Sequence, residues 1–136
     1  MMNTKQTQDS IDYWRKTAEH DYDTMCVLFK TKRYSDCLFF GHIILEKILK
    51  AHVVKTTGQQ PPYIHNLTKL HEVAELNLNE KQLDFLDAVN DFNIRARYPE
   101  HKLKFYQQCT LKYTQPYFKK ITELYHELCQ KLKPKK

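Results

Sequence analysis

The scarcity of glycine is the feature that most constrains the fold of this chain. Its 136 residues include only two glycines, Gly41 and Gly58, and five prolines. A fold made of many short strands needs a tight turn at each connection, and such turns favour glycine. The long segments between these residues are instead rich in lysine, leucine, glutamate, glutamine and alanine, which favour helices. The sequence therefore predicts an all-α protein.

Apolar residues recur every three or four positions in five segments, which is the spacing of one helix face. The first predicted helix begins near Asp9 or Ser10, which can cap its first turn, and ends near Phe29. After a short connection, Ser35 is expected to cap a second helix, and Gly58 ends it. Apolar residues cover more than half of the circumference of this second helix, so we expect it to lie at the centre of the protein.

Three further helices are predicted from the remaining segments. Asn66 is expected to cap the third and Asn79 the fourth. The last helix runs to about Leu132 with Pro116 in its first turn, or an earlier turn through FYQQCTLKY leads into it at a kink. No linker or internal repeat divides the chain. We therefore expect a single domain over residues 1–136, an antiparallel bundle of about five helices. Residues 1–8 and 132–136 are expected to be frayed.

The composition limits where the protein acts and on what. The 22 Lys and Arg residues exceed the 16 Asp and Glu residues, giving a formal net charge of +6. This modest positive charge favours the approach of polyanions such as RNA and nucleotides without proving that they bind. No segment approaches the roughly 18 uninterrupted apolar residues of a membrane span. The N-terminal stretch MMNTKQTQDS lacks the apolar core of a secretory signal, so we expect a cytoplasmic protein.

Several common kinds of site are missing from the sequence. The four cysteines form no CxxC pair and have no histidine at zinc spacing, so we expect buried free thiols and no metal site. There is no glycine-rich phosphate loop and no acidic cluster that would hold magnesium. No cofactor is predicted, and any catalysis would have to come from side chains alone.

The stretch NIRARYPEHK, residues 93–102, concentrates the residues most able to do chemistry, on a predicted polar loop that runs to about Leu103. A metal-independent ribonuclease needs a group that titrates near neutrality, as histidine does. It also needs a cation for the charge on phosphate, as arginine provides. His101 with Arg95 or Arg97 would supply both. Alternatively, the arginines pair with acidic residues and only fasten the loop: Glu46, Asp87, Asp91 or Glu100.

The other histidines are expected to be mostly structural. His42 faces inward or toward a partner in the second helix, and we expect it to hydrogen-bond across helices. His65 is expected to tie the proline-rich loop to a helix end through a backbone contact, and His52 to be a satisfied interior residue. Three others are predicted to lie on the surface: His20, His71 and His126.

Several segments together resemble the HEPN family of small helical proteins. The segment DYWRKTAEHDYDTMCVLFKTKRYSDCLFFGHIILEKILKAHVV is similar to the family's first two helices. GQQPPYIHNLTKL is similar to its proline-rich loop followed by His-Asn/Asp-Leu, and ARYPE with a long closing helix completes the likeness. The resemblance implies an up-and-down four-helix core plus a short helix, usually as a homodimer.

The same resemblance implies nucleotide or RNA binding in a cleft between helices or between subunits. Many members of the family form toxin–antitoxin pairs with a minimal nucleotidyltransferase, so an antitoxin protein of that type is an expected partner. Catalytically active members cut RNA without metal and have an arginine followed shortly by a histidine. Arg95 and His101, with five residues between them, match this spacing, although Ala96 stands where these members commonly have a polar residue.

The main expectation is therefore a binding module for nucleotide or RNA in a basic cleft. Arg95, Arg97 and His101 would contact phosphate. Tyr98, held extended by the following proline, would stack on a base or close the pocket, and His42 is a further candidate ligand contact. The first alternative is a metal-independent ribonuclease toxin with His101 as general acid/base and Arg95 as phosphate clamp. The second is a non-catalytic module that serves only a partner protein.

Overall fold

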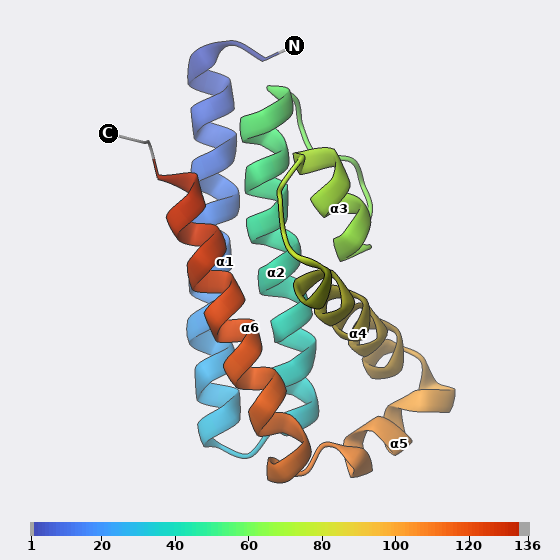
Figure 1. Cartoon of the computed structure of the whole chain (residues 1–136). Coiled ribbons are helices and arrows are strands. Elements are labelled where there is room, and N and C mark those ends of the chain that lie inside the picture. Colours follow the sequence, from blue (N-terminus) through green and yellow to red (C-terminus); the bar gives the residue numbers. More distant parts are fainter. Residues whose placement is uncertain (1, 134–136) are drawn as a thin grey trace.

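The computed structural model of the chain describes residues 2–133, and within that range it contains six helices and no strand. The predicted all-α class is confirmed, with one helix more than expected. No described helix is both long and apolar enough to cross a lipid bilayer. The helices, drawn in Figure 1, are α1 (Thr4–Lys30), α2 (Tyr34–Thr57), α3 (Leu67–Ala74), α4 (Glu80–Arg97), α5 (Pro99–Gln108) and α6 (Leu111–Leu132).

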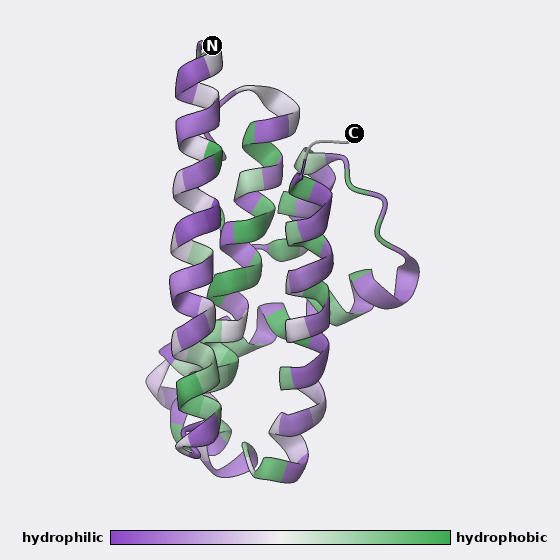
Figure 2. Ribbon diagram, turned by 90° about the vertical axis from the view of Figure 1, so that its left-hand side faces the viewer, coloured by the Kyte–Doolittle hydropathy of each residue, from purple (hydrophilic) through white to green (hydrophobic). Residues whose placement is uncertain are grey.

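Helix α2 is the centre of the bundle, as its apolar circumference predicted. More than half of its 24 residues are buried, and it packs against each of the other five described helices. Figure 2 shows the contrast between α1, which is mostly hydrophilic, and the more hydrophobic α2. An element that contacts all the others fixes their relative positions, so side chains on α2 are placed to connect distant parts of the chain.

Aromatic pairs show the direction in which α1 and α6 run. Tyr22 stacks on Tyr125, with ring centroids 4.9 Å apart, and Phe29 stacks on Phe118 at 4.1 Å. Residue numbers rise along α1 while they fall along α6, so these two helices are antiparallel. α1 and α2 are also antiparallel, since they form a hairpin across residues 31–33. α2 and α6 consequently run in the same direction, side by side (Figure 1).

Gly41 allows α2 and α6 to approach closely. A Cβ atom at this position would lie 2.5 Å from Cδ1 of Ile121, a fully buried side chain of α6. The second glycine, Gly58, has φ +67° and ends α2 in the left-handed conformation, where glycine is favoured. Both glycines in the sequence therefore have a structural reason to be glycine.

Two predicted helix starts are wrong. α1 begins at Thr4, because Asn3 and Gln6 form a capping box that satisfies the first amides. The prediction of Asp9 or Ser10 followed the apolar pattern, which begins later than the helix. α2 begins at Tyr34, before Ser35, and Arg33 occupies its N-cap without a side-chain hydrogen bond. The predicted caps Asn66 and Asn79 are confirmed.

The predicted polar loop over residues 93–103 is also wrong. Residues 93–97 are the last turn of α4, and α5 begins at Pro99, a residue whose fixed φ suits the first position of a helix.

Thr110 caps α6 and Pro116 lies inside that helix, not in its first turn. The missing N–H of Pro116 leaves free only the carbonyl of Lys112, an exposed residue that water can reach. Of the expected frayed ends, residues 4–8 are helical, and residues 1 and 134–136 lie outside the described part of the chain.

Candidate functional site

The stretch 93–102 forms a corner between two helices. Tyr98 is its one non-helical residue, with φ −87° and ψ 127°, which is the extended conformation expected before proline. It ends α4 and serves as the N-cap of α5 without a capping side chain. The chain therefore turns sharply at one residue, and side chains before and after it are held by helical backbone.

Arg95 is mostly engaged inside the protein. Its side chain is 24% exposed, and Nη1 lies 3.6 Å from Oδ2 of Asp91 one turn earlier. The guanidinium lies over the ring of Phe105, with Cζ 4.9 Å from the ring centroid, a cation–π arrangement. The ion pair with Asp91 is one of the pairings that the structural alternative predicted, and the contact with Phe105 connects α4 to α5.

Arg97 is free of acidic partners. It is exposed, and no carboxylate of the described residues lies within ion-pair distance of it. Its Cζ lies 5.6 Å from the centroid of the Phe39 ring on α2. The flat face of the guanidinium is thus supported by an aromatic ring while its N–H groups remain available, which suits the recognition of phosphate.

Tyr98 and His101 are also accessible, but His101 is not fixed. Tyr98 is 53% exposed. His101 is exposed in the first turn of α5, where its backbone amide donates to the carbonyl of Tyr98 at 2.9 Å. Within residues 2–133, no hydrogen bond or ion pair joins its imidazole to Arg95 or Arg97. The structure therefore places Arg97, Tyr98 and His101 at one accessible corner and turns Arg95 toward Asp91 and Phe105.

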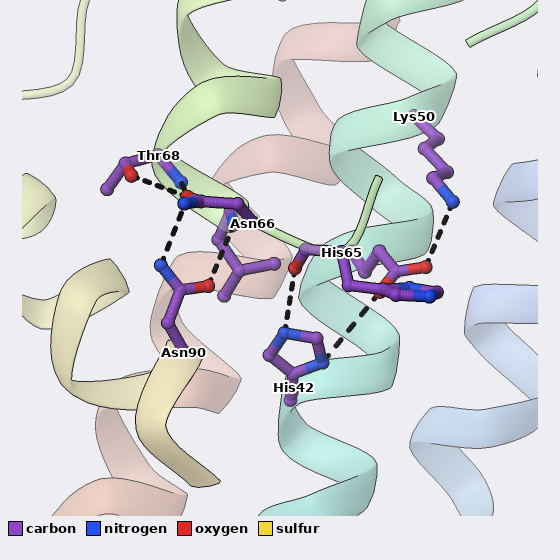
Figure 3. A network of polar contacts seen from close by, with 8 residues as sticks. His42, Lys50, His65, Asn66, Thr68 and Asn90 are labelled. Atoms are coloured by element: carbon purple, nitrogen blue, oxygen red, sulfur yellow. Dashed lines mark hydrogen bonds and ion pairs between the residues drawn. The ribbon is translucent and has the colours of Figure 1, made fainter. Parts of the chain in front are cut away.

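A second group of polar residues lies farther along α2, where the proline-rich loop crosses it (Figure 3). We call it the Glu46 cluster: His42, Glu46 and Lys50 on α2 and His65 on the loop. Glu46 Oε1 lies 2.9 Å from Nδ1 of His65, and Lys50 Nζ donates to Oε2 at 3.0 Å. His42 Nε2 donates to the backbone carbonyl of His65 at 3.0 Å. The prediction that His42 bonds across helices is wrong, because its partner is a loop carbonyl; the predicted backbone tie of His65 is this same hydrogen bond, made to the middle of α2 and not to a helix end.

His42 connects the Glu46 cluster to the corner. It is 1% exposed, and burial is the main reason why its pKa is lowered from its ordinary value. The charge of Glu46 opposes this shift, while the positive charge of Arg97 adds to it. Its Nδ1 is buried without a hydrogen bond among the described residues and faces Oε1 of Glu46 at 3.9 Å. Burial therefore favours the neutral form of His42, and the side chain is too enclosed to touch a ligand in this conformation.

Asparagine side chains hold the loop beside the Glu46 cluster (Figure 3). Asn66 Oδ1 accepts from the amides of Thr68 and Lys69 and so caps α3. Asn90 of α4 donates to the same oxygen at 3.2 Å and accepts from the amide of Leu67 at 2.8 Å. These bonds tie the residues immediately after His65 to both α3 and α4, which limits the movement of His65.

Sequence reasoning missed Glu46 and Lys50 as members of a site. A usable signal was present, because His42, Glu46 and Lys50 are spaced four residues apart and lie on one face of a helix. The surface prediction for His71 is also wrong, since it is buried and its Nε2 accepts from the amide of Leu78 at 3.3 Å. The interior prediction for His52 is confirmed, because its Nε2 bonds to the carbonyl of Leu128 at 2.8 Å.

The grooves of the described chain do not collect the predicted phosphate contacts. The groove between α4 and α6 carries both signs of charge, because its lining includes Lys81 and Lys120 as well as Glu123 and Glu127. Another, between the start of α1 and Gln60, is lined mainly by neutral side chains. Within a single chain, the corner is thus an accessible surface and not the wall of a deep pocket.

Comparison with known proteins assigns the chain to a family. No curated protein matches the sequence significantly, and no solved structure does so either. The family model described as HEPN domain matches residues 11–133, which is nearly the whole chain and includes both the corner and the Glu46 cluster. The chain therefore belongs to the HEPN family.

Proposed function

We propose that this HEPN protein binds nucleotide or RNA through the corner between α4 and α5, with Arg97 as the main phosphate contact. The proposal rests on the exposure of Arg97 and on its lack of an acidic partner among the described residues. Its guanidinium is exposed, has no acidic partner among the described residues and lies over Phe39. An arginine that is oriented but unpaired keeps its N–H groups for an external anion.

The surroundings of Arg97 support the same function. Tyr98 offers an exposed ring next to it, and aromatic rings stack on bases regardless of sequence. His101 and the exposed Lys102 and Lys104 follow in α5, adding positive charge where a phosphate chain would run. Because Arg95 is already paired with Asp91, the arrangement favours binding over the ribonuclease mechanism that uses Arg95 and His101.

We further propose that the binding form is a homodimer in which a second copy of the chain provides the other wall of the cleft. Large apolar side chains are exposed around the corner: Ile94, Tyr98, Leu103, Tyr106 and Leu111. Large apolar side chains exposed on neighbouring helices suit an interface with another chain. Sedimentation equilibrium should show a dimer that Leu103→Glu weakens, and a wild-type protein that stays monomeric would contradict this proposal.

The test of the binding function compares two substitutions on the same helix. Arg97→Ala removes the proposed contact, while Lys81→Ala removes one exposed positive charge about 24 Å away along α4, given 1.5 Å per residue. Affinity for a fluorescently labelled single-stranded RNA is measured by anisotropy. Loss of a charge-assisted phosphate contact should weaken binding about tenfold in Arg97→Ala, or about 1.4 kcal/mol, and Lys81→Ala should bind nearly as well as wild type.

Thermal unfolding of both variants provides the control for structure. Since both side chains are exposed, each substitution should change stability by less than about 0.5 kcal/mol. Equal weakening of RNA binding by the two variants would show that only overall charge matters. Unchanged affinity together with lost stability in Arg97→Ala would show that Arg97 has a structural role and would refute the proposal.

A further inference from the structure

Glu46 fixes which nitrogen of His65 carries the proton. The carboxylate oxygen lies 2.9 Å from Nδ1 and can only accept a hydrogen bond while ionised, so Nδ1 must be the donor. Lys50 donates to the other carboxylate oxygen at 3.0 Å, so both oxygens of Glu46 serve as hydrogen-bond acceptors. In neutral His65 the lone pair is therefore on Nε2. No described residue bonds to that nitrogen, and the side chain is 47% exposed.

The position of the His65 ring is fixed from both sides of the residue. Its backbone carbonyl accepts from His42, and Asn66 directly after it caps α3 and bonds to Asn90. Pro61 and Pro62 restrict the chain before it. His101 offers a contrast, because no described side chain orients its imidazole. A histidine with one nitrogen held by a carboxylate and the other directed outward is organised for an external partner.

The chemistry of Nε2 changes with a single proton. When Nε2 is unprotonated, its lone pair repels a phosphate oxygen. When Nε2 is protonated, its N–H donates a charge-assisted hydrogen bond to that oxygen. The charged and titratable groups around the ring are Glu46, Lys50 and His42 on α2, with Arg97 acting on His42 from the end of α4. Tyr63, on the same loop, is 97% exposed, and its ring centroid lies 6.5 Å from that of His65.

We propose that His65 is a proton-linked phosphate contact: protonated Nε2 donates to a phosphate of the bound nucleotide or RNA, and Tyr63 stacks on an adjacent base. Exposed aromatic rings beside cationic donors are the usual components of single-strand binding surfaces. The inference rests on the proposed binding function and extends it, since it adds a second contact region and makes affinity depend on pH. Binding strengthens as the pH falls.

The test measures the affinity for a labelled single-stranded RNA of about ten uridines between about pH 8 and about pH 6. Each linked proton changes the affinity by up to about tenfold per pH unit. His65→Asn keeps an amide N–H for Glu46 but removes Nε2. The slope of the logarithm of the affinity against pH should therefore fall by one linked proton, and binding at low pH should weaken. His101→Asn is measured in parallel, because His101 can contribute a linked proton of its own.

His20→Asn is the matched control. His20 is also an exposed histidine beside a carboxylate, with Nδ1 3.6 Å from Oδ1 of Asp21, but among the described residues its side chain has no contact with His65 or Arg97. Its slope should equal that of wild type. A His65→Asn protein with the wild-type slope and affinity would overturn the inference, as would an equal loss of slope in His20→Asn.

Imidazole nitrogen NMR of the wild-type protein tests the inference without any substitution. Neutral His65 should show the tautomer with the proton on Nδ1, and added inorganic phosphate should shift its Nε2 signal at low pH. A proton on Nε2 in neutral His65, or no response to phosphate, would overturn it even if His65→Asn does not fold.

The experiments also separate this inference from the proposed function. Binding that is sensitive to Arg97→Ala but not to His65→Asn overturns the inference alone. Binding that is sensitive to His65→Asn but not to Arg97→Ala overturns the role of the corner alone. If no RNA binds at either end of the pH range, both are overturned.

Discussion

Replacing Gly41 by alanine tests the close packing of α2 against α6. The new Cβ would lie 2.5 Å from Cδ1 of Ile121, well inside the roughly 3.5–4.0 Å at which two carbon atoms attract each other best. Overpacking of a well-filled core costs about 1–3 kcal/mol. Alanine in place of glycine within a helix contributes about 1 kcal/mol in the opposite direction. We expect a net destabilisation of about 1 kcal/mol.

The effect of Gly41→Ala on the free energy of unfolding should change sign when Ile121 is shortened to valine. That change removes Cδ1 and by itself costs about 1 kcal/mol. The other two atoms of Ile121 near the new Cβ lie at 3.6 Å, an ordinary contact distance. In the Ile121→Val protein, Gly41→Ala should therefore stabilise by about 1 kcal/mol through helix propensity alone, giving a coupling of about 2 kcal/mol between the two sites.

Urea unfolding of the four proteins, followed by far-ultraviolet circular dichroism, measures this cycle. The free energies of unfolding are compared only if all four proteins show two-state transitions with similar slopes. If Gly41→Ala stabilises the wild-type protein, or has the same effect in both backgrounds, Gly41 does not permit the close approach of α2 and α6 and the packing argument is refuted.

Three further predictions concern the ends of helices and the buried histidines. Gly58→Ala should cost about 1 kcal/mol, because φ +67° disfavours a side chain and no atom lies within 4 Å to compensate; no change in thermal unfolding would contradict this. Asn66→Ala should cost about 1 kcal/mol by removing the cap of α3, whereas the exposed Lys69→Ala should cost less in the same urea assay. Burial lowers the pKa of three histidines from the ordinary value of 6.5: His42, His52 and His71. Their folded-state pKa lies below the unfolded one, so the free energy of unfolding should fall as the pH drops below about 6.5. His52→Gln should reduce this loss of stability at low pH. If the free energy of unfolding depends on pH in this variant as it does in wild type, His52 does not contribute to the loss.

The parts of the fold that could be predicted depend on local rules. Asn66 and Asn79 could be predicted as caps because each precedes an apolar periodic segment, and the central place of α2 followed from apolar residues over more than half of its circumference. The corner could not be predicted, because a proline preceded by tyrosine suits both a loop and the first position of a helix. Phe105 decides between them, since its burial against Arg95 and Phe92 gives α5 a reason to form.

The candidate site was only partly predictable for a related reason. The types of residue in 93–102 identified arginine and histidine as possible phosphate contacts, but pairing depends on direction along a helix. Arg95 and Asp91 are four residues apart on α4 and meet on one face, whereas Arg97 lies two residues farther on and faces Phe39. The Glu46 cluster depends on a contact between Glu46 and His65, which are 19 positions apart. No local sequence pattern predicts that the loop carrying His65 lies against α2.

The anchored loop between Gly58 and Asn66 has a thermodynamic consequence for any ligand that touches it. A flexible segment loses conformational entropy when it binds, which subtracts from the affinity. Here the two prolines limit the chain before binding, and the Asn66–Asn90 and His42–His65 bonds hold its end. The end of the loop and the ring of His65 are therefore held in place once the protein has folded. A ligand would meet His65 already in its binding geometry, so much of the free energy of that contact would appear as affinity.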